Sequence, residues 1–305
     1  MSIRFDGRVA IVTGAGAGLG RSHALALAAR GAKVLVNDLG GARDGSGGSA
    51  VAAQAVADEI RAAGGEAIAN GANVADYDAV QAMVKQAMDA WGRVDILVNN
   101  AGILRDKTFS KMEIADFRAV IDVHLFGSVH CTKAVWEIMR TQQYGRIVMT
   151  TSSSGLYGNF GQSNYGAAKM AVVGLMNTLV MEGGKYGIRV NALAPAAGTR
   201  MTEGLFPQQA YDLLTPEAVT TGLLVLCAEE APNRLILTAG AGGFACTHIN
   251  ETRGIHLTSE QRSPENVLAS LAAITDRAGE EEYTNGGQQG LKFIGDAMQA
   301  LASKQ

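Results

Sequence analysis

The chain has 305 residues, of which 47% are hydrophobic and 18% are charged, the balance of a globular protein with a large core. Its formal net charge of −3 provides no strong positive field, so we do not expect a nucleic-acid-binding protein. Only five residues are proline and no run of about 18 apolar residues occurs, which argues against a disordered chain and against a membrane-spanning one.

The three cysteines, Cys131, Cys227 and Cys246, are far apart and form no CxxC pair. This spacing predicts neither a disulfide framework nor a zinc site, and we expect no metal. The first ten residues lack the pattern of a secretory signal, so the expected location is the cytoplasm.

Short apolar segments alternate with longer helical ones along most of the chain. Strands are predicted at residues 9–13, 33–37, 66–70, 94–98, 146–150, 188–193 and 235–238. Helices are predicted at residues 18–29, 49–63, 77–91, 114–142 and 165–185. This alternation indicates a Rossmann-like α/β fold, a doubly wound parallel sheet of about seven strands, with ligands bound at the carboxyl ends of the strands.

Two segments lie outside this alternation. The glycine-rich segment 40–48 is predicted to be a surface loop, with a ligand clamp as the alternative. Residues 246–305 are predicted to form a helical C-terminal extension, with helices at 263–277 and 290–303, after a dinucleotide-binding domain at 1–245.

The turn after the first strand reads Thr13-Gly-Ala-Gly-Ala-Gly18-Leu-Gly20 and runs directly into a helix. Glycines in such a turn let a pyrophosphate approach the backbone, and the helix N-terminus supplies free N–H groups. Asp38 ends the second strand about 20 residues later, where a carboxylate accepts hydrogen bonds from ribose hydroxyls and repels a 2′-phosphate. The pattern predicts NAD rather than NADP, although Asp38 as an ordinary turn residue is the alternative.

Three residues are candidates for the chemistry. Tyr165 and Lys169 are spaced i and i+4 on a predicted helix and therefore share one face. A nearby ammonium group favours the phenolate, so we expect the pKa of Tyr165 to be lowered and the residue to act as a proton acceptor or donor. Ser152 follows the fifth strand and is placed to hydrogen-bond the substrate oxygen.

These motifs together resemble the short-chain dehydrogenase/reductase family of the compact type, over residues 7–245. The resemblance rests on Thr13-Gly-x-x-x-Gly18-x-Gly20, Asn99-Asn-Ala-Gly102, Ser152, Tyr165-x-x-x-Lys169 and Asn191-x-x-x-Pro195. It implies that the cofactor contacts Gly14, Gly18, Leu19, Gly20, Asp38, Asn73, Val74, Asn100, Ala101, Gly102, Tyr165, Lys169, Pro195 and Thr199.

His124 stands where the family usually has a catalytic Asn that holds a proton-relaying water. The resemblance implies that His124 takes this role through its carbonyl or its ring; the alternative is a packed histidine with no role. The family also implies a homodimer or homotetramer.

Val36–Gly41, Tyr144–Met149 and Gly155–Gln162 are similar to one branch, the (3R)-hydroxyacyl-CoA dehydrogenase domain of peroxisomal multifunctional enzymes of type 2, also called 17β-hydroxysteroid dehydrogenase type 4. This similarity implies NAD-dependent interconversion of a secondary alcohol and a ketone on a hydrophobic small molecule, either a (3R)-hydroxyacyl-CoA or a hydroxysteroid. The alternatives are a 3-ketoacyl reductase-type enzyme and a non-catalytic NAD-binding regulatory protein. Residues 201–214 are expected to form an apolar lid over the substrate, or an ordinary helix at the domain edge.

Overall fold

The computed structural model describes residues 2–198 and 207–302. The chain divides into two compact units, Met1–Cys246 and Thr247–Gln305. Thr199, which the family resemblance places at the cofactor, and residues 201–206 of the predicted lid lie outside the described residues.

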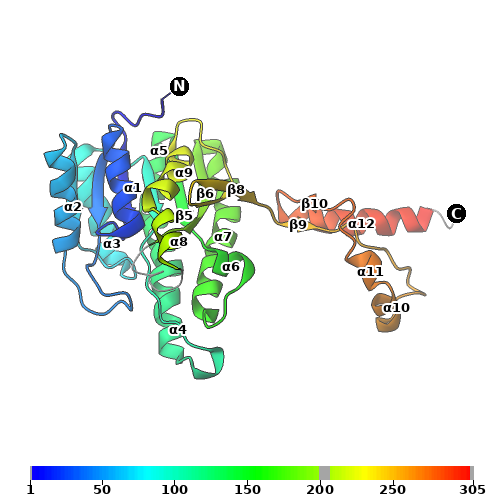
Figure 1. Cartoon of the computed structure of the whole chain (residues 1–305). Coiled ribbons are helices and arrows are strands. Elements are labelled where there is room, and N and C mark those ends of the chain that lie inside the picture. The colour runs from blue at the N-terminus through cyan, green and yellow to red at the C-terminus, as the bar shows by residue number, and fades with distance from the viewer. Residues whose placement is uncertain (1, 199–206, 303–305) are drawn as a thin grey trace. The chain divides into compact units, whose positions relative to one another are not determined.

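One sheet with the strand order β3-β2-β1-β4-β5-β6-β7-β8 forms the centre of the first unit (Figure 1). The pairing is parallel from β3 to β7, and the strand order reverses between β1 and β4. The strands are β1 (Val9–Thr13), β2 (Lys33–Asn37), β3 (Ala67–Asn70), β4 (Ile96–Asn99), β5 (Gly145–Thr150), β6 (Ile188–Ala196), β7 (Ile236–Gly240) and β8 (Gly243–Thr247). The predicted doubly wound α/β fold is confirmed.

Helices cover both faces of the sheet because its strands are apolar on both sides. In β1, Ala10 and Val12 pack in one buried cluster with α1, α2 and α9, whereas Ile11 packs in the other with α3, α5 and α7. The helices of this unit are α1 (Gly18–Ala29), α2 (Val51–Ala62), α3 (Tyr77–Trp91), α4 (Ile114–Ile121), α5 (Gly127–Gln142), α6 (Ser153–Tyr157), α7 (Ser163–Gly183), α8 (Gln208–Leu213) and α9 (Pro216–Cys227).

The sequence predicted one continuous helix over residues 114–142, but the structure has a π-helical turn at Asp122–Phe126 between α4 and α5. A π-turn holds one extra residue, so the side chains after it are rotated relative to those before it. His124 lies inside this turn and is buried. Such turns are frequent at functional sites.

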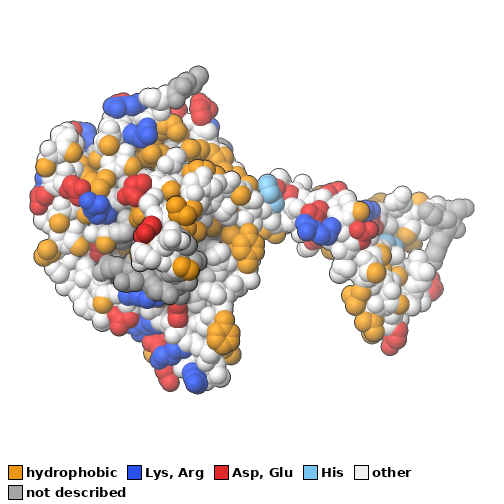
Figure 2. Space-filling model, in the orientation of Figure 1, with side chains coloured by type: hydrophobic (Ala, Val, Ile, Leu, Met, Phe, Trp, Pro, Cys, Tyr) orange, Lys and Arg blue, Asp and Glu red, His pale blue; other side chains and the backbone are white. Residues whose placement is uncertain are grey.

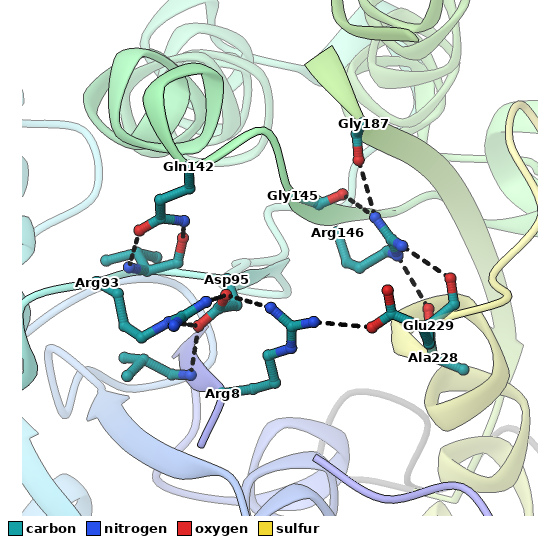
Figure 3. A network of polar contacts seen from close by, with 11 residues as sticks. Arg8, Arg93, Asp95, Gln142, Gly145, Arg146, Gly187, Ala228 and Glu229 are labelled. Atoms are coloured by element: carbon teal, nitrogen blue, oxygen red, sulfur yellow. Dashed lines mark hydrogen bonds and ion pairs between the residues drawn. The ribbon is translucent and has the colours of Figure 1, made fainter. Parts of the chain in front are cut away.

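A polar network ties the amino ends of the strands together, at the edge opposite the expected ligand site (Figure 3). The carboxylate of Asp95, which is fully buried, accepts hydrogen bonds from Arg8, from Arg93 and from the backbone N–H of Val9. Arg146, on β5, donates to the carbonyl oxygens of Ala228, Glu229, Gly145 and Gly187. These contacts satisfy charged groups that would be costly to bury alone.

The sheet has one more strand than the predicted seven. β7 and β8 are joined by the two-residue turn Ala241–Gly242, in which both residues have positive φ (49° and 80°), the geometry of a tight hairpin. Residues of β8 are mostly exposed, so the segment lacks the apolar pattern from which the other strands were predicted.

The sequence had suggested a helical extension, but the second unit contains strands as well as helices. It contains α10 (Pro264–Ala269), α11 (Leu271–Ile274) and α12 (Gly286–Ala302), together with a small antiparallel pair, β9 (Asn250–Glu251) and β10 (Glu281–Glu282). Apolar side chains of α10 and α11, among them Val267, Leu268 and Leu271, are exposed (Figure 2). Among the helices of the described ranges, none is long and apolar enough to cross a bilayer.

Candidate active site

A cavity of about 400 Å³ lies beyond the carboxyl ends of β1, β2 and β4, where the strand order reverses. This is the place at which open α/β sheets bind ligands. Ten of the residues predicted to contact the cofactor line this single cavity: Gly14, Gly18, Leu19, Gly20, Asp38, Asn73, Val74, Asn100, Ala101 and Gly102.

The glycine turn between β1 and α1 is packed too closely for side chains. A Cβ atom on Gly14, which has φ of +63°, would lie 2.7 Å from Cα of Ala101, and one on Gly20 would overlap the carbonyl oxygen of Gly14. Ala17 caps α1 without a side-chain hydrogen bond, and the first turn of the helix has no acidic residue. The free N–H groups at this end of α1 therefore face the cavity without a side-chain acceptor, which fits a phosphate group.

Asn100 holds the glycine turn against the end of β4. Its side-chain amide donates to the carbonyl oxygens of Thr13 and Gly14, at 2.9 and 3.0 Å. The hydroxyl of Thr13 in turn accepts from the backbone N–H groups of Asn100 and Ala101. The floor of the cavity is thus fixed by hydrogen bonds between two neighbouring strands.

Asp38 lies at the end of β2 and accepts two backbone hydrogen bonds. Gly16 N–H donates to Oδ2 at 2.7 Å, and Gly40 N–H donates to Oδ1 at 2.6 Å. Each carboxylate oxygen has a second lone pair, so both can still accept from ribose hydroxyls. The glycine turn, the open end of α1 and Asp38 together fit an adenine dinucleotide.

Asn73 and Val74 line the cavity after β3. The side-chain oxygen of Asn73 accepts from the N–H of Ala75 at 3.0 Å, and the carbonyl of Val74 is 2.9 Å from Nδ1 of His130. Both residues are therefore held in place at the wall of the cavity, where the family resemblance puts the adenine.

Tyr165 and Lys169 lie one turn apart on α7, as the spacing predicted. The ammonium nitrogen of Lys169 is 5.5 Å from the centre of the Tyr165 ring and donates a 2.6 Å hydrogen bond to the carbonyl of Thr150. Tyr165 packs against the buried cluster of Ile103, Val120 and Ala168, and Ile103 also lines the cavity, so the tyrosine adjoins this cavity.

Burial dominates the titration of both groups. It lowers the pKa of Lys169 to about 7 and raises the pKa of Tyr165 to about 12, although a hydrogen bond with Ser152 acts in the opposite direction on the phenol. The expected lowering of the tyrosine pKa is therefore not found, because desolvation of the phenolate outweighs the hydrogen bond with Ser152.

Ser152 caps the N-terminus of α6, directly after β5. Its hydroxyl accepts from the N–H of Ser154 at 3.2 Å and interacts with Tyr165. The local fold thus brings together Ser152, Tyr165 and Lys169 from three positions in the sequence, beside the cavity rather than in its lining.

His124 lies between the cavity wall and Tyr165. Its ring stands edge-on to that of Tyr165 with 5.1 Å between the centres, and its Nε2 is 2.8 Å from the carbonyl oxygen of Ile103. Burial, followed by the charge of Lys169, lowers the pKa of His124 well below its usual value, so the ring is neutral at pH 7. The carbonyl of His124 accepts from Ser128 at 2.7 Å, and its Nδ1 has no partner among the described residues.

The close approach of His124 also explains Gly102. A Cβ atom at position 102 would overlap Cε1 of the imidazole ring, so glycine is required beside this histidine. Pro195 lies on β6 and is not among the residues that line the cavity.

The cavity has further walls that the sequence did not assign to the cofactor site. Residues of the glycine-rich loop after β2 line one side, which favours the ligand-clamp alternative for this segment. The high glycine content of the segment was the only signal in the sequence. These additional lining residues include Gly41, Ala42, Arg43, Gly45, Ile103, Arg105, Ala119, Asp122 and Val123.

Comparison with known proteins agrees with this geometry. The sequence profile described as short chain dehydrogenase matches residues 8–210. Peroxisomal multifunctional enzyme type 2 of Mus musculus is 48% identical over 280 residues, which cover 90% of this chain and 37% of that protein. The chain thus spans well under half the length of this relative.

Two solved structures extend the comparison. Full-length peroxisomal multifunctional enzyme type 2 of Drosophila melanogaster has a TM-score of 0.80 and 37% identity, covering 96% of this chain and 49% of that one. A 7α-hydroxysteroid dehydrogenase complexed with NADH and 7-oxo glycochenodeoxycholic acid has a TM-score of 0.71 and 32% identity, covering 79% of this chain and 95% of that one.

Proposed function

Because the chain belongs to the short-chain dehydrogenase family, we propose that it catalyses the NAD-dependent interconversion of a secondary alcohol and a ketone on a lipid-like substrate. The observation that carries this proposal is the placement of Ser152, Tyr165 and Lys169 beside a cavity that fits a dinucleotide. All three groups are present, which counts against a non-catalytic NAD-binding regulatory protein.

The residues that would hold the cofactor are those of the cavity. The glycine turn and the open end of α1 would bind the pyrophosphate, Asp38 the adenosine ribose, and Lys169 the nicotinamide ribose. Bound NAD would supply a hydride acceptor for the alcohol carbon at this place. Thr199 and Pro195 stay proposed cofactor contacts.

The proton of the alcohol is the part of the reaction that the protein handles. Ser152 would donate a hydrogen bond to the substrate oxygen while the phenolate of Tyr165 removes the hydroxyl proton; in the reverse direction the phenol returns it. Lys169 would favour the phenolate by its charge, and with a pKa of about 7 it carries that charge on part of the molecules at neutral pH. His124 would orient the phenol ring through its edge contact.

The substrate is proposed to be a (3R)-hydroxyacyl-CoA or a hydroxysteroid. Support comes from the names of the relatives, a multifunctional enzyme and a hydroxysteroid dehydrogenase. A 3-ketoacyl reductase-type enzyme working in the opposite direction is the alternative. The cytoplasmic location and assembly as a homodimer or homotetramer also stay proposals.

A direct test is to follow NADH formation by the purified protein with panels of (3R)-hydroxyacyl-CoAs and hydroxysteroids, using NAD+ and NADP+ in parallel. We expect turnover with NAD+, and we expect Tyr165→Phe to reduce kcat at least about 100-fold, because the variant has no proton acceptor. The binding of NADH to this variant should be retained.

Tyr186→Phe is the matched control, since the hydroxyl of Tyr186 interacts with Arg140 and Lys185 and the residue does not line the cavity, so kcat should stay unchanged. Full activity of Tyr165→Phe, or preference for NADP+, would contradict the proposal.

A further inference from the structure

The loop at residues 39–49 is anchored at its base to the ribose-binding end of the cavity. Ser49 N–H donates to the carbonyl of Leu39 at 2.7 Å, and Gly40 N–H donates to Asp38. Gly40 has φ of +74°, and a Cβ atom there would overlap the carbonyl oxygen of Ser49, so the closed base requires glycine. The loop therefore leaves β2 in a defined direction.

The tip of the same loop is docked on the segment that follows β4. The N–H of Leu104 donates to the carbonyl of Arg43, and Nε of Arg105 donates to the carbonyl of Asp44, both at 2.9 Å. Gly45 lies so close to Ile103 that a Cβ atom would be 3.1 Å from its side chain. Because both the loop and this segment line the cavity, the loop crosses from one wall to the other as a roof.

Arg105 joins this roof to the catalytic side of the molecule. Its guanidinium also pairs with Asp116 on α4 at 3.1 Å, and the Arg105 side chain is 31% exposed. Its carbonyl accepts a 3.0 Å hydrogen bond from Asn164, the residue before Tyr165. The guanidinium of Arg105 is therefore already paired within the protein, and the residue has the contacts of a positioning residue.

Arg43 differs from Arg105 in this respect. It is exposed and lines the cavity, and its guanidinium has no hydrogen bond or ion pair within the part of the chain that the structure describes. The carboxylates that line the cavity are those of Asp38, which already accepts from Gly16 and Gly40, and of Asp122. An unpaired, planar guanidinium on the wall of a cavity can donate two hydrogen bonds to two oxygens of one phosphate group.

We propose that the loop 39–49 is a roof over the cavity in which Arg43 contacts a phosphate of the bound ligand, while Arg105 is the positioning residue that keeps the roof docked. The inference rests on the proposed function. The phosphate belongs either to the pyrophosphate of the dinucleotide or to coenzyme A in a thioester substrate.

The test measures binding rather than turnover. NADH is titrated into wild-type protein and Arg43→Gln by fluorescence, and coenzyme A is then titrated into the NADH-loaded proteins. Loss of one charge-assisted contact should raise a Kd about tenfold and reduce its dependence on salt. A weaker NADH complex assigns the contact to the dinucleotide, and a weaker coenzyme A complex alone assigns it to the substrate.

Arg118→Gln is the matched control, because Arg118 is exposed on α4 and does not line the cavity. Equal affinities of wild type and Arg43→Gln for both ligands would overturn the proposed contact between Arg43 and a ligand phosphate. Failure of the wild type to bind NADH would instead remove the proposed function and this inference with it.

The positioning role has its own readout. In Arg105→Ala we expect faster amide hydrogen exchange throughout residues 39–49 and a higher Kd for NADH. Lys107→Ala is the control, since Lys107 shares Asp116 with Arg105 but has no hydrogen bond or ion pair with the loop within the described residues. Unchanged exchange and unchanged affinity in Arg105→Ala would overturn the positioning role of Arg105.

Discussion

Lys169 is a cation in an environment that opposes charge. Its side chain is 4% exposed, its hydrogen bond goes to the carbonyl of Thr150, and burial lowers its pKa to about 7 from the ordinary 10.5. The unfolded chain therefore binds a proton at this residue between about pH 7 and 10.5 that the folded protein does not bind. Over this window the free energy of unfolding rises with pH. Burying this lysine therefore lowers the stability of the folded protein near neutral pH.

Lys169→Met should consequently be more stable than the wild type near pH 7, by an amount on the order of a few kcal/mol. The advantage should shrink as the pH rises toward the ordinary pKa of 10.5, because the unfolded chain then begins to lose the proton that the folded protein has already lost. Urea unfolding at pH 7 and pH 10 measures it. Lys133→Met, on the exposed surface of α5, should show no such change, and an equal gap at both pH values would contradict the prediction.

At the scale of the elements, the amino ends of β1, β4 and β5 are held by charges. Asp95 is fully buried and satisfied by Arg8, Arg93 and the first N–H of β1. The guanidinium groups of Arg8 and Arg146 also lie over the ring of Tyr144, at 3.6 and 4.1 Å from its centre. Removing the carboxylate charge would leave Arg93 without its ion-pair partner and Arg8 paired with Glu229 alone.

Asp95→Asn should lower the free energy of unfolding by about 2–3 kcal/mol, less than for a fully buried pair because Arg8 and Arg93 are partly exposed. The midpoint of urea unfolding measures this loss. Asp89→Asn breaks an exposed pair with Lys85 on α3 and should cost at most about 0.5 kcal/mol. Equal losses in the two variants would show that the network does not stabilise the sheet.

At the scale of the whole molecule, many apolar side chains remain exposed within the second unit. Leu291, Ile294, Met298 and Leu301 follow one another along α12 at helical spacing and are each more than half exposed. Contiguous apolar surface of this kind is uncommon in monomers.

We therefore expect the protein to assemble with copies of itself, as a homodimer or homotetramer. Light scattering coupled to size-exclusion chromatography should give two or four times the mass of the chain. A monomeric mass at micromolar concentration would contradict the expectation.

The sequence predicted best those features in which the residue type itself is required by the local backbone or by the ligand. The glycine turn and Asp38 were predicted from their spacing, and the structure places them on one cavity. The strands β1, β2, β4 and β5 were recognised because they are apolar on both faces. β8 was missed because it is a mostly exposed hairpin strand.

Other features depend on contacts that no local pattern reveals. The π-helical turn at Asp122–Phe126 has no sequence signature in the surrounding helix, and the pKa of Tyr165 depends on how deeply tertiary packing buries it. The docking of Arg43 and Asp44 on residues 104 and 105 joins segments about sixty positions apart.

The π-helical turn has a consequence for how this chain tolerates length changes. Deleting one residue from Asp122–Phe126 would restore regular winding and swing every side chain of α5 by about 100° around the helix axis relative to α4. Cys131, Val135 and Met139 would then leave their places against the sheet. A deletion of one residue at this position would therefore disrupt the packing of α5 against the sheet, whereas the same deletion in an exposed connection would have little effect on the core.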